Sequence, residues 1–164
     1  MFVIIVGGGR TGTELAKSLL VEGHKIKIIE ERIEVIERLQ ENLDRDLIVH
    51  GEASSPAILE EAGIREAQVL AAVTREDEAN LVVATLARYE FGVPRVIARV
   101  NNPKNAWLFT PEMGVDVALN PAALFSKLIL EEMSLGDMMT LLKLRKGEYS
   151  IVEEKVHPEA VAVG

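Results

Sequence analysis

The sequence of 164 residues contains no cysteine. Disulfide bonds and thiolate metal sites are therefore excluded. No run of 18 consecutive apolar residues occurs, so no segment is predicted to span a membrane. Met1 leads directly into an apolar run without a basic start or a cleavage site, which argues against a signal peptide. These absences predict a soluble cytoplasmic protein.

Clustered positive charge is also missing. The formal net charge is −8, from 26 acidic and 18 basic residues, and Lys and Arg form no stripe. Binding of nucleic acid requires clustered Lys and Arg to neutralise phosphates. We therefore expect no nucleic-acid partner.

The first thirty residues carry the strongest functional signal. The apolar run 2–6 predicts a buried strand, followed by the glycine loop 7–12 and a helical pattern that ends at Glu22. A second apolar run, 25–29, ends in Glu30. This order of strand, glycine turn, helix, strand and acid is the layout that binds a dinucleotide or an adenine nucleotide.

Five of the six residues of the loop have a physical reason to be there. Gly7 allows a tight turn, Gly9 lets the backbone approach a pyrophosphate, and Gly12 lets the helix lie against the sheet. Thr11 and Gly12 would lie in the first helical turn, where free N–H groups attract phosphate. Arg10 is a cation that could reach a phosphate as a planar fork.

Glu30 follows Gly12 by 18 residues. A spacing of roughly 20 is expected for a carboxylate that accepts hydrogen bonds from ribose hydroxyls. The same charge should repel a 2′-phosphate and disfavour NADP. NAD(H) and ATP/ADP both present free ribose hydroxyls, and the residues leave both open.

The chain then alternates between helical and strand patterns. Helices are predicted over 32–43, 56–63, 78–91 and 103–114, and strands over 47–49, 68–73, 95–100 and 115–119. Nearly continuous apolar strands that alternate with helices predict an α/β fold: a doubly wound, Rossmann-like parallel sheet of about six strands. Because ligands bind outside the carboxyl ends of such strands, loops 7–12, 30–32, 51–54 and 73–75 should line one crevice.

The last part of the chain departs from this alternation. A helix predicted over 121–134 has more apolar residues than one stripe requires, so it packs against another subunit or is a well-buried terminal helix. Strands predicted over 139–145 and 149–156 would form a hairpin with its turn at 146–148. We expect a domain over 1–135, and over 136–164 a linker and the opening strands of a truncated second domain.

Several motifs in register resemble a known family, and the likeness covers roughly residues 1–135. Besides the glycine loop, they are Gly51-Glu52-Ala53-Ser54, Ala72-Val73-Thr74 with Asp77-Glu78 and Asn80-Leu81-Val82, Ala98-Arg99-Val100-Asn101, Gly114-Val115-Asp116 and Asn120-Pro121. The chain resembles the RCK or KTN domain, the nucleotide-binding regulatory domain of potassium channels and transporters. Among its members, the Trk-type (TrkA-like) peripheral subunits are most similar.

The resemblance implies a role for each site residue and a cofactor, NAD(H) or ATP/ADP. Phosphates would be held by Gly7, Gly9, Arg10, Thr11 and Gly12; the adenosine ribose by Glu30, with Glu31 and Arg32 alongside; adenine by Glu52, Ala53 and Ser54; Val73 and Thr74 would border the phosphates or the second ribose, with Arg99 near the anionic end. The stretch Arg99-Val100-Asn101 holds no acid and position 122 is Ala, so the Ca²⁺ sites of some members are not expected.

The resemblance also implies partners. Helix 121–134 would be the crossover helix of a homodimer or larger ring. The chain would act as a cytoplasmic regulatory subunit at the inner face of the cell membrane. There, nucleotide binding would change its conformation and gate an integral-membrane potassium transporter subunit.

Two other functions remain as alternatives. A small NAD-dependent oxidoreductase would need a substrate domain and a proton donor at the nicotinamide. The candidates His24, His50 and His157 lie in a turn, on the adenine side and in the tail, so we expect no catalysis. The second alternative is a Rossmann interaction module without ligand.

Overall fold

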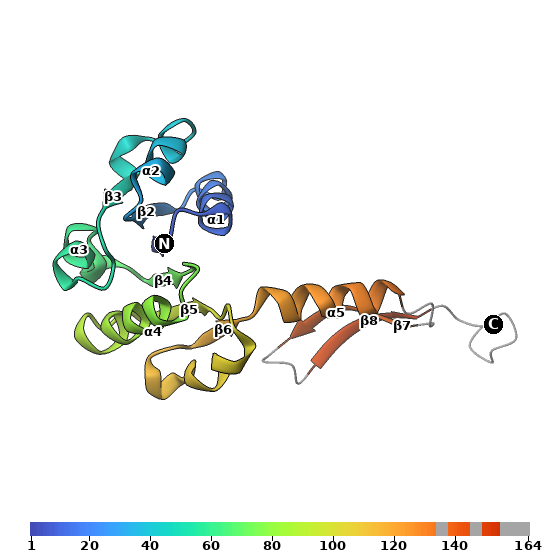
Figure 1. The fold of residues 1–164 in the computed structure, drawn as a ribbon. Coiled ribbons are helices and arrows are strands. Elements are labelled where there is room, and N and C mark those ends of the chain that lie inside the picture. Colours follow the sequence, from blue (N-terminus) through green and yellow to red (C-terminus); the bar gives the residue numbers. More distant parts are fainter. Residues whose placement is uncertain (134–137, 145–148, 155–164) are drawn as a thin grey trace, which may run out of the picture. The chain divides into compact units, whose positions relative to one another are not determined.

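The computed structural model describes residues 1–133, 138–144 and 149–154 (Figure 1). Contacts between residues divide the chain into two compact units, Met1–Pro121 and Ala122–Gly164. Each unit is described by itself below. The predicted domain boundary at 135/136 and the predicted turn at 146–148 lie outside the described residues.

A six-stranded parallel sheet forms the centre of the first unit, which confirms the predicted doubly wound α/β fold. Its strands are β1 (Phe2–Val6), β2 (Lys25–Glu30), β3 (Ile48–His50), β4 (Val69–Ala72), β5 (Arg95–Arg99) and β6 (Val117–Leu119). They lie in the order β3-β2-β1-β4-β5-β6, with β1 and β4 adjacent at the centre. In this order the connections reverse direction beside β1, and ligands bind at that point in such sheets.

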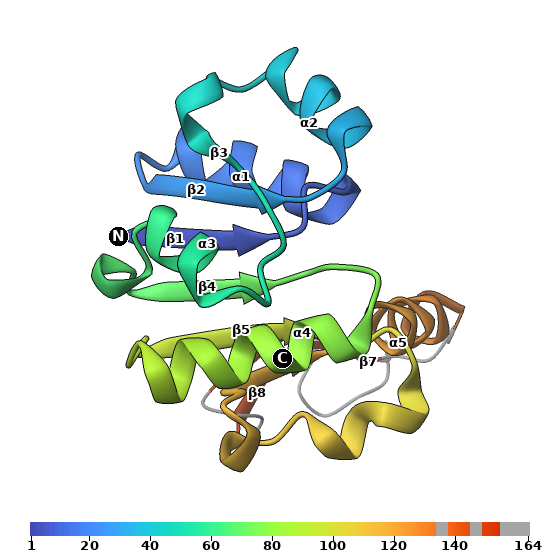
Figure 2. The same cartoon turned by 60° about the vertical axis from the view of Figure 1, so that its left-hand side comes forward.

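Helices cover both faces of the sheet (Figure 2). They are α1 (Arg10–Val21), α2 (Ile33–Gln40), α3 (Pro56–Glu61) and α4 (Asp77–Thr85), which continues as a π-helical turn over Leu86–Glu90; short 3₁₀ turns lie at Arg45–Leu47 and Ile64–Glu66. Alternate side chains of β1 divide the core: Val3 and Ile5 pack on the side of α1 and α2, and Ile4 and Val6 on the side of α3 and α4.

The prediction of a helix over 103–114 is wrong. The segment forms two 3₁₀ turns, η4 (Pro103–Leu108) and η5 (Pro111–Met113). A helix that begins at Pro103 cannot pass Pro111, which has no N–H to donate and restricts Thr110 to an extended conformation. Asn102 does cap the first turn, since its side chain accepts a hydrogen bond from the Lys104 backbone N–H at 3.1 Å.

Asp77 anchors this irregular segment to the start of α4. Its carboxylate, in a residue only 6% exposed, accepts hydrogen bonds from the backbone N–H groups of Asn101 and Asn102 and from the side-chain amides of Asn101 and Asn105, at 2.6–3.1 Å. Burial acts to raise the pKa of Asp77, but these hydrogen bonds outweigh it and lower the pKa below its usual value.

Replacing Asp77 by Asn should therefore destabilise the fold by about 1–3 kcal/mol at neutral pH. The NH₂ group of the new amide would replace one acceptor oxygen and would face the N–H donors that now bind it. A lowered native pKa means that the unfolded state takes up the proton first as the pH falls. The contribution of Asp77 is thus complete above the unfolded value near 3.8 and is lost as the pH falls through the lower native pKa. Urea unfolding of both proteins across this range should show their difference shrinking in acid. A difference that stays constant with pH would contradict this.

The second unit contains helix α5 (Pro121–Met133) apart from its first residue, and two antiparallel strands, β7 (Met138–Leu144) and β8 (Tyr149–Glu154), close to the predicted ranges. Large apolar side chains of α5 are exposed, namely Leu124, Phe125, Leu128, Ile129, Leu130 and Met133. Within the described part of the chain, no helix is both long enough and apolar enough to cross a membrane.

Candidate nucleotide-binding site

Two cavities that share lining residues open at the carboxyl ends of the strands. The first, of about 310 Å³, is called the carboxylate cavity and is lined by Val6, Gly7, Ile29, Glu30, Glu31, Arg32, Gly51, Glu52, Ala53, Ser54, Thr74, Arg75, Glu76, Ala79 and Val83. The second, of about 380 Å³, is called the arginine cavity and is lined by Gly7, Gly9, Arg10, Thr11, Arg32, Val73, Thr74, Arg75 and Arg99. Each volume suits part of a small-molecule ligand.

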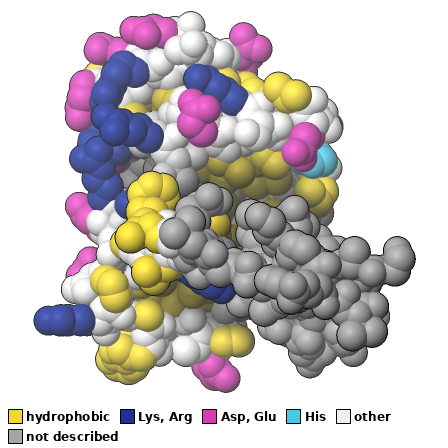
Figure 3. Space-filling view, turned by 90° about the vertical axis from the view of Figure 1, so that its right-hand side faces the viewer, with side chains coloured by type: hydrophobic (Ala, Val, Ile, Leu, Met, Phe, Trp, Pro, Cys, Tyr) yellow, Lys and Arg dark blue, Asp and Glu magenta, His cyan; other side chains and the backbone are white. Residues whose placement is uncertain are grey.

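The two cavities differ in charge. Four glutamates and two arginines line the carboxylate cavity, whereas four arginines and no acidic residue line the arginine cavity. Lys and Arg side chains gather along one edge of the molecule (Figure 3), although the chain as a whole carries a net charge of −8. Such a local excess of one sign attracts a ligand of the opposite sign. The arginine cavity is therefore suited to an anion, and the carboxylate cavity to hydrogen-bond donors.

Two glycines of the glycine loop, Gly7 and Gly9, line these cavities. Gly7 has a φ of +103°, a left-handed conformation that the turn after β1 requires. A Cβ at Gly12 would lie 1.9 Å from the carbonyl oxygen of Gly7, so α1 can approach the loop only with glycine there. A Cβ at Gly9 would meet nothing within 4 Å. Gly9 thus leaves open space in front of the first turn of α1, where helical N–H groups lack partners within the helix.

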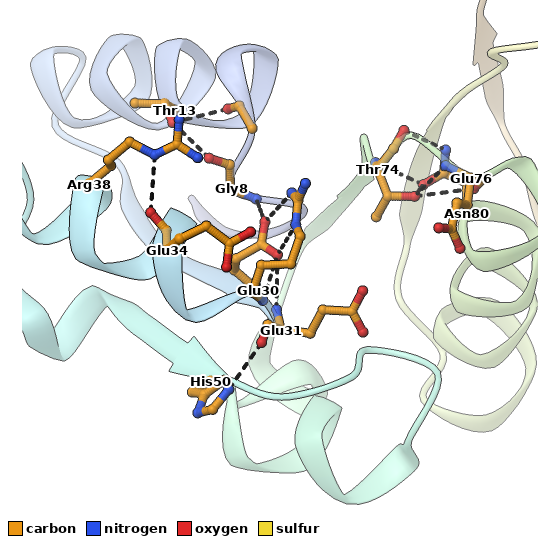
Figure 4. Close-up of polar contacts among 12 residues, drawn as sticks. Gly8, Thr13, Glu30, Glu31, Glu34, Arg38, His50, Thr74, Glu76 and Asn80 are labelled. Atoms are coloured by element: carbon orange, nitrogen blue, oxygen red, sulfur yellow. Dashed lines mark hydrogen bonds and ion pairs between the residues drawn. The ribbon is translucent and has the colours of Figure 1, made fainter.

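Glu30 ends β2 with its carboxylate almost fully buried, at 3% exposure of the side chain. Oε2 accepts from the Gly8 N–H at 2.8 Å (Figure 4), and Oε1 accepts from the N–H groups of Glu31 and Arg32, both at 3.0 Å. The guanidinium of Arg32 donates to both oxygens, from Nε at 2.9 Å and from Nη2 at 2.8 Å. Burial acts to raise the pKa of Glu30, but these contacts with Arg32 and Gly8 outweigh it and lower the pKa.

Asn80 of α4 is fully buried and lines neither cavity, but it binds Thr74, which lines both. Its Oδ1 accepts from the backbone N–H and the hydroxyl of Thr74, at 2.9 and 2.7 Å, and its Nδ2 donates to the Arg99 carbonyl at 3.0 Å. Figure 4 shows Thr74 and Asn80 across from Glu30, with the Glu31 side chain extending toward them. Asn80 therefore fixes the loop after β4 to the end of β5.

Arg99 carries a polar atom that lacks a partner. Its Nε is buried and makes no hydrogen bond with any described residue. Buried polar side-chain atoms nearly always have a partner, so such an orphan requires an explanation. Because Arg99 lines the arginine cavity, an anion bound there offers one.

The predicted site residues, except Gly12, line one or both cavities. Glu30, Glu31, Glu52, Ala53 and Ser54 line the carboxylate cavity; Gly9, Arg10, Thr11, Val73 and Arg99 line the arginine cavity; Gly7, Arg32 and Thr74 line both. Gly12 is buried in α1 and makes the close approach instead. Contact of these residues with a ligand stays a prediction.

Sequence reasoning missed several lining residues. Arg75 fell within the expected crevice but was not named as a site residue, and Glu76 and Ala79 were not expected at all. The signal for these three was their position after β4, since the loop and first helical turn after a central strand face the ligand.

His24 and His50 line neither cavity, and His50 Nε2 lies 3.1 Å from the Glu31 carbonyl oxygen. Among the described residues, no group of three or more His, Asp or Glu is placed to hold a metal ion.

The strand order, the glycine loop after β1 and the acid at the end of β2 together define a Rossmann-type α/β domain. The family model described as the TrkA-N domain matches residues 3–121. The chain belongs to the TrkA-N domain family.

Several relatives of the chain are TrkA proteins. It is 37% identical over 158 residues to the Trk system potassium uptake protein TrkA of Mycobacterium tuberculosis, covering 93% of this chain and 69% of that protein. A TrkA homolog of Methanothermobacter thermautotrophicus is 32% identical over 161 residues, covering 98% and 73%. TrkA of Halomonas elongata is 33% identical, but only 33% of its length is covered.

Solved structures share the fold. The TrkA-N domain of the Escherichia coli inner membrane protein ybaL matches with a TM-score of 0.72 at 22% identity, over 81% of this chain and 96% of that domain. GsuK bound to ADP matches at 0.68 and 21% identity, over 81% and 34%. The GsuK channel bound to NAD matches at 0.68 and 22% identity, over 79% and 22%.

Proposed function

We propose that this chain is a nucleotide-binding regulatory subunit of a potassium uptake system, not an enzyme, and that it binds NAD(H) or ATP/ADP. The observation that carries the proposal is the pair of cavities at the glycine loop, one lined by four carboxylates and two arginines and the other by four arginines and no carboxylate. A nucleotide has matching parts, because its ribose hydroxyls donate hydrogen bonds and its phosphates are anions. The family and the names of the relatives support potassium uptake as the process.

The residues present fit such a ligand. The open space at Gly9 admits a phosphate against the first turn of α1, and the unpartnered Nε of Arg99 supplies a donor. Phosphates would be held by Gly7, Gly9, Arg10, Thr11 and Arg99; ribose by Glu30, Glu31 and Arg32; adenine by Glu52, Ala53 and Ser54; Val73 and Thr74 would border the phosphates. Gly12 would act through packing.

Assembly is the second part of the proposal. The exposed apolar side chains of α5 support a homo-oligomer, a dimer or a larger ring, that buries residues 121–134 between copies. The assembled subunit would lie in the cytoplasm at the inner face of the membrane, on an integral-membrane potassium transporter subunit. In this view residues 1–135 are the nucleotide-binding domain and residues 136–164 begin a further domain.

Regulation would follow from two subunit arrangements with different affinity for nucleotide. A ligand shifts such an equilibrium only by the ratio of its affinities for the two states. Nucleotide in the cavities would therefore bias the geometry between the sheet and the helix that follows β6, and the membrane partner would respond to that change.

The experiment is a binding panel on the purified protein with NAD⁺, NADH, NADP⁺, ATP, ADP and AMP, by thermal shift and then calorimetry. A ligand of the native state raises the melting temperature by mass action. We expect a shift with NAD(H) or with ATP/ADP, and a smaller one with NADP⁺ because of Glu30. No shift with any of the six would overturn the proposal and favour an interaction module without ligand.

A further inference from the structure

Glu30 is the residue that should accept the ribose hydroxyls, yet its carboxylate already has five donors. Three are the backbone N–H groups of Gly8, Glu31 and Arg32, and two are on the Arg32 guanidinium. A carboxylate offers about four lone-pair sites. Because the Glu30 side chain is only 3% exposed, a ribose cannot reach it while Arg32 stays in place.

Arg32 itself is free to leave on steric grounds. Its side chain is 37% exposed, and the residue lines the arginine cavity as well as the carboxylate cavity. If the guanidinium moves away, the three backbone N–H groups still bind the Glu30 carboxylate, so the buried charge keeps partners.

We propose that Arg32 is the specificity-determining residue of the site: it holds Glu30 closed to ribose until the phosphates of a ligand draw its guanidinium off Glu30 and toward the other arginines of the arginine cavity. Arg10, Arg75 and Arg99 line that cavity, and without an anion a fourth guanidinium is repelled by them. A diphosphate reverses the sign of the field and offers a bidentate partner in place of Glu30.

The consequence is coupling between the two halves of the ligand. A nucleoside without phosphate must break the Arg32–Glu30 pair and provides nothing in exchange, whereas a nucleoside diphosphate or a dinucleotide replaces it. The affinity for a nucleoside is therefore lower than the loss of the phosphate contacts alone would make it. This inference rests on the proposed nucleotide binding and adds the residue that discriminates nucleotides from nucleosides.

The test measures the affinity for adenosine and for ADP in the full chain, by displacement of a fluorescent ADP analogue whose affinity is determined for each variant. In Arg32→Ala, adenosine should bind about tenfold more tightly, because charge-assisted hydrogen bonds no longer have to be broken. Arg32→Lys should tighten adenosine by a smaller factor, since an ammonium cannot form the bidentate pair.

Arg75→Ala is the matched control. Arg75 lines the same two cavities but is not among the donors to Glu30. Its removal should weaken ADP about tenfold and leave adenosine unchanged. A purely structural role of Arg32 would weaken both ligands. Adenosine affinity in Arg32→Ala that equals or falls below that of the wild type would overturn the inference while nucleotide binding stands. A wild type that does not bind ADP or the other nucleotides would overturn both proposals.

Discussion

Leucine in place of Gly9 is expected to reduce nucleotide affinity at least about a hundredfold, or about 2.8 kcal/mol. Gly9 precedes the first turn of α1 and lines the arginine cavity, and a Cβ there would project into open space. A leucine side chain would fill the place where a pyrophosphate must approach the backbone. Calorimetry with ADP and with NAD⁺ measures the loss.

The same variant should keep its fold. Gly9 has a φ of −66°, which any residue can adopt, and no neighbouring atom has to move. Loss of a favourable N-cap residue should cost less than about 1 kcal/mol. Gly9→Ala should reduce affinity by an intermediate factor. If Gly9→Leu bound ADP and NAD⁺ as tightly as the wild type, the glycine loop would not be the phosphate site.

The features of this chain that could be predicted from sequence are local. The apolar run 2–6, the glycine loop and Glu30 lie within thirty consecutive residues, and their order alone specifies a strand, a turn and a helix. The remaining strands followed from short apolar runs at regular spacing. The sheet edge that carries the cavities followed in turn, because parallel strands place their carboxyl ends together.

The features that could not be predicted depend on contacts between distant residues. Asn80 connects to Arg99, 19 residues later, and Asp77 connects to Asn105, 28 residues later. Nothing in the local sequence indicates which amide or carboxylate will be buried at such a junction. Both residues were placed correctly after β4, but their roles emerge only when β4 and β5 lie side by side.

The Arg32–Glu30 pair shows a different limit. The two residues are separated by one position, and the family resemblance implied that Arg32 lies alongside Glu30 at the ribose. Whether Arg32 turns toward solvent, a phosphate or the carboxylate depends on the bend between β2 and α2, where the backbone N–H groups of Glu31 and Arg32 also turn toward Glu30. The sequence therefore predicted Glu30 as a ribose acceptor, and only the structure shows that its carboxylate is already paired with Arg32.

Gly12 offers the largest expected effect on stability. From helix propensity alone, Gly12→Ala should stabilise α1 by about 1 kcal/mol. We expect the opposite sign, a loss of about 3 kcal/mol or more, because the new Cβ would lie 1.9 Å from the Gly7 carbonyl oxygen and 3.3 Å from Cγ2 of buried Ile5. The obstructing atom belongs to the backbone of the glycine loop, so α1 itself has to move.

Gly9→Ala is the matched control, because it adds the same methyl group three residues earlier, where nothing lies within 4 Å. Urea unfolding followed by far-UV circular dichroism should show a large fall in the midpoint for Gly12→Ala and less than about 1 kcal/mol of change for Gly9→Ala. Equal midpoints for the two variants would mean that α1 shifts away from the loop at little cost. That result would show that the close approach of Gly12 to Gly7 does not fix the position of the first turn of α1. The proposed phosphate side of the site would then depend on other contacts.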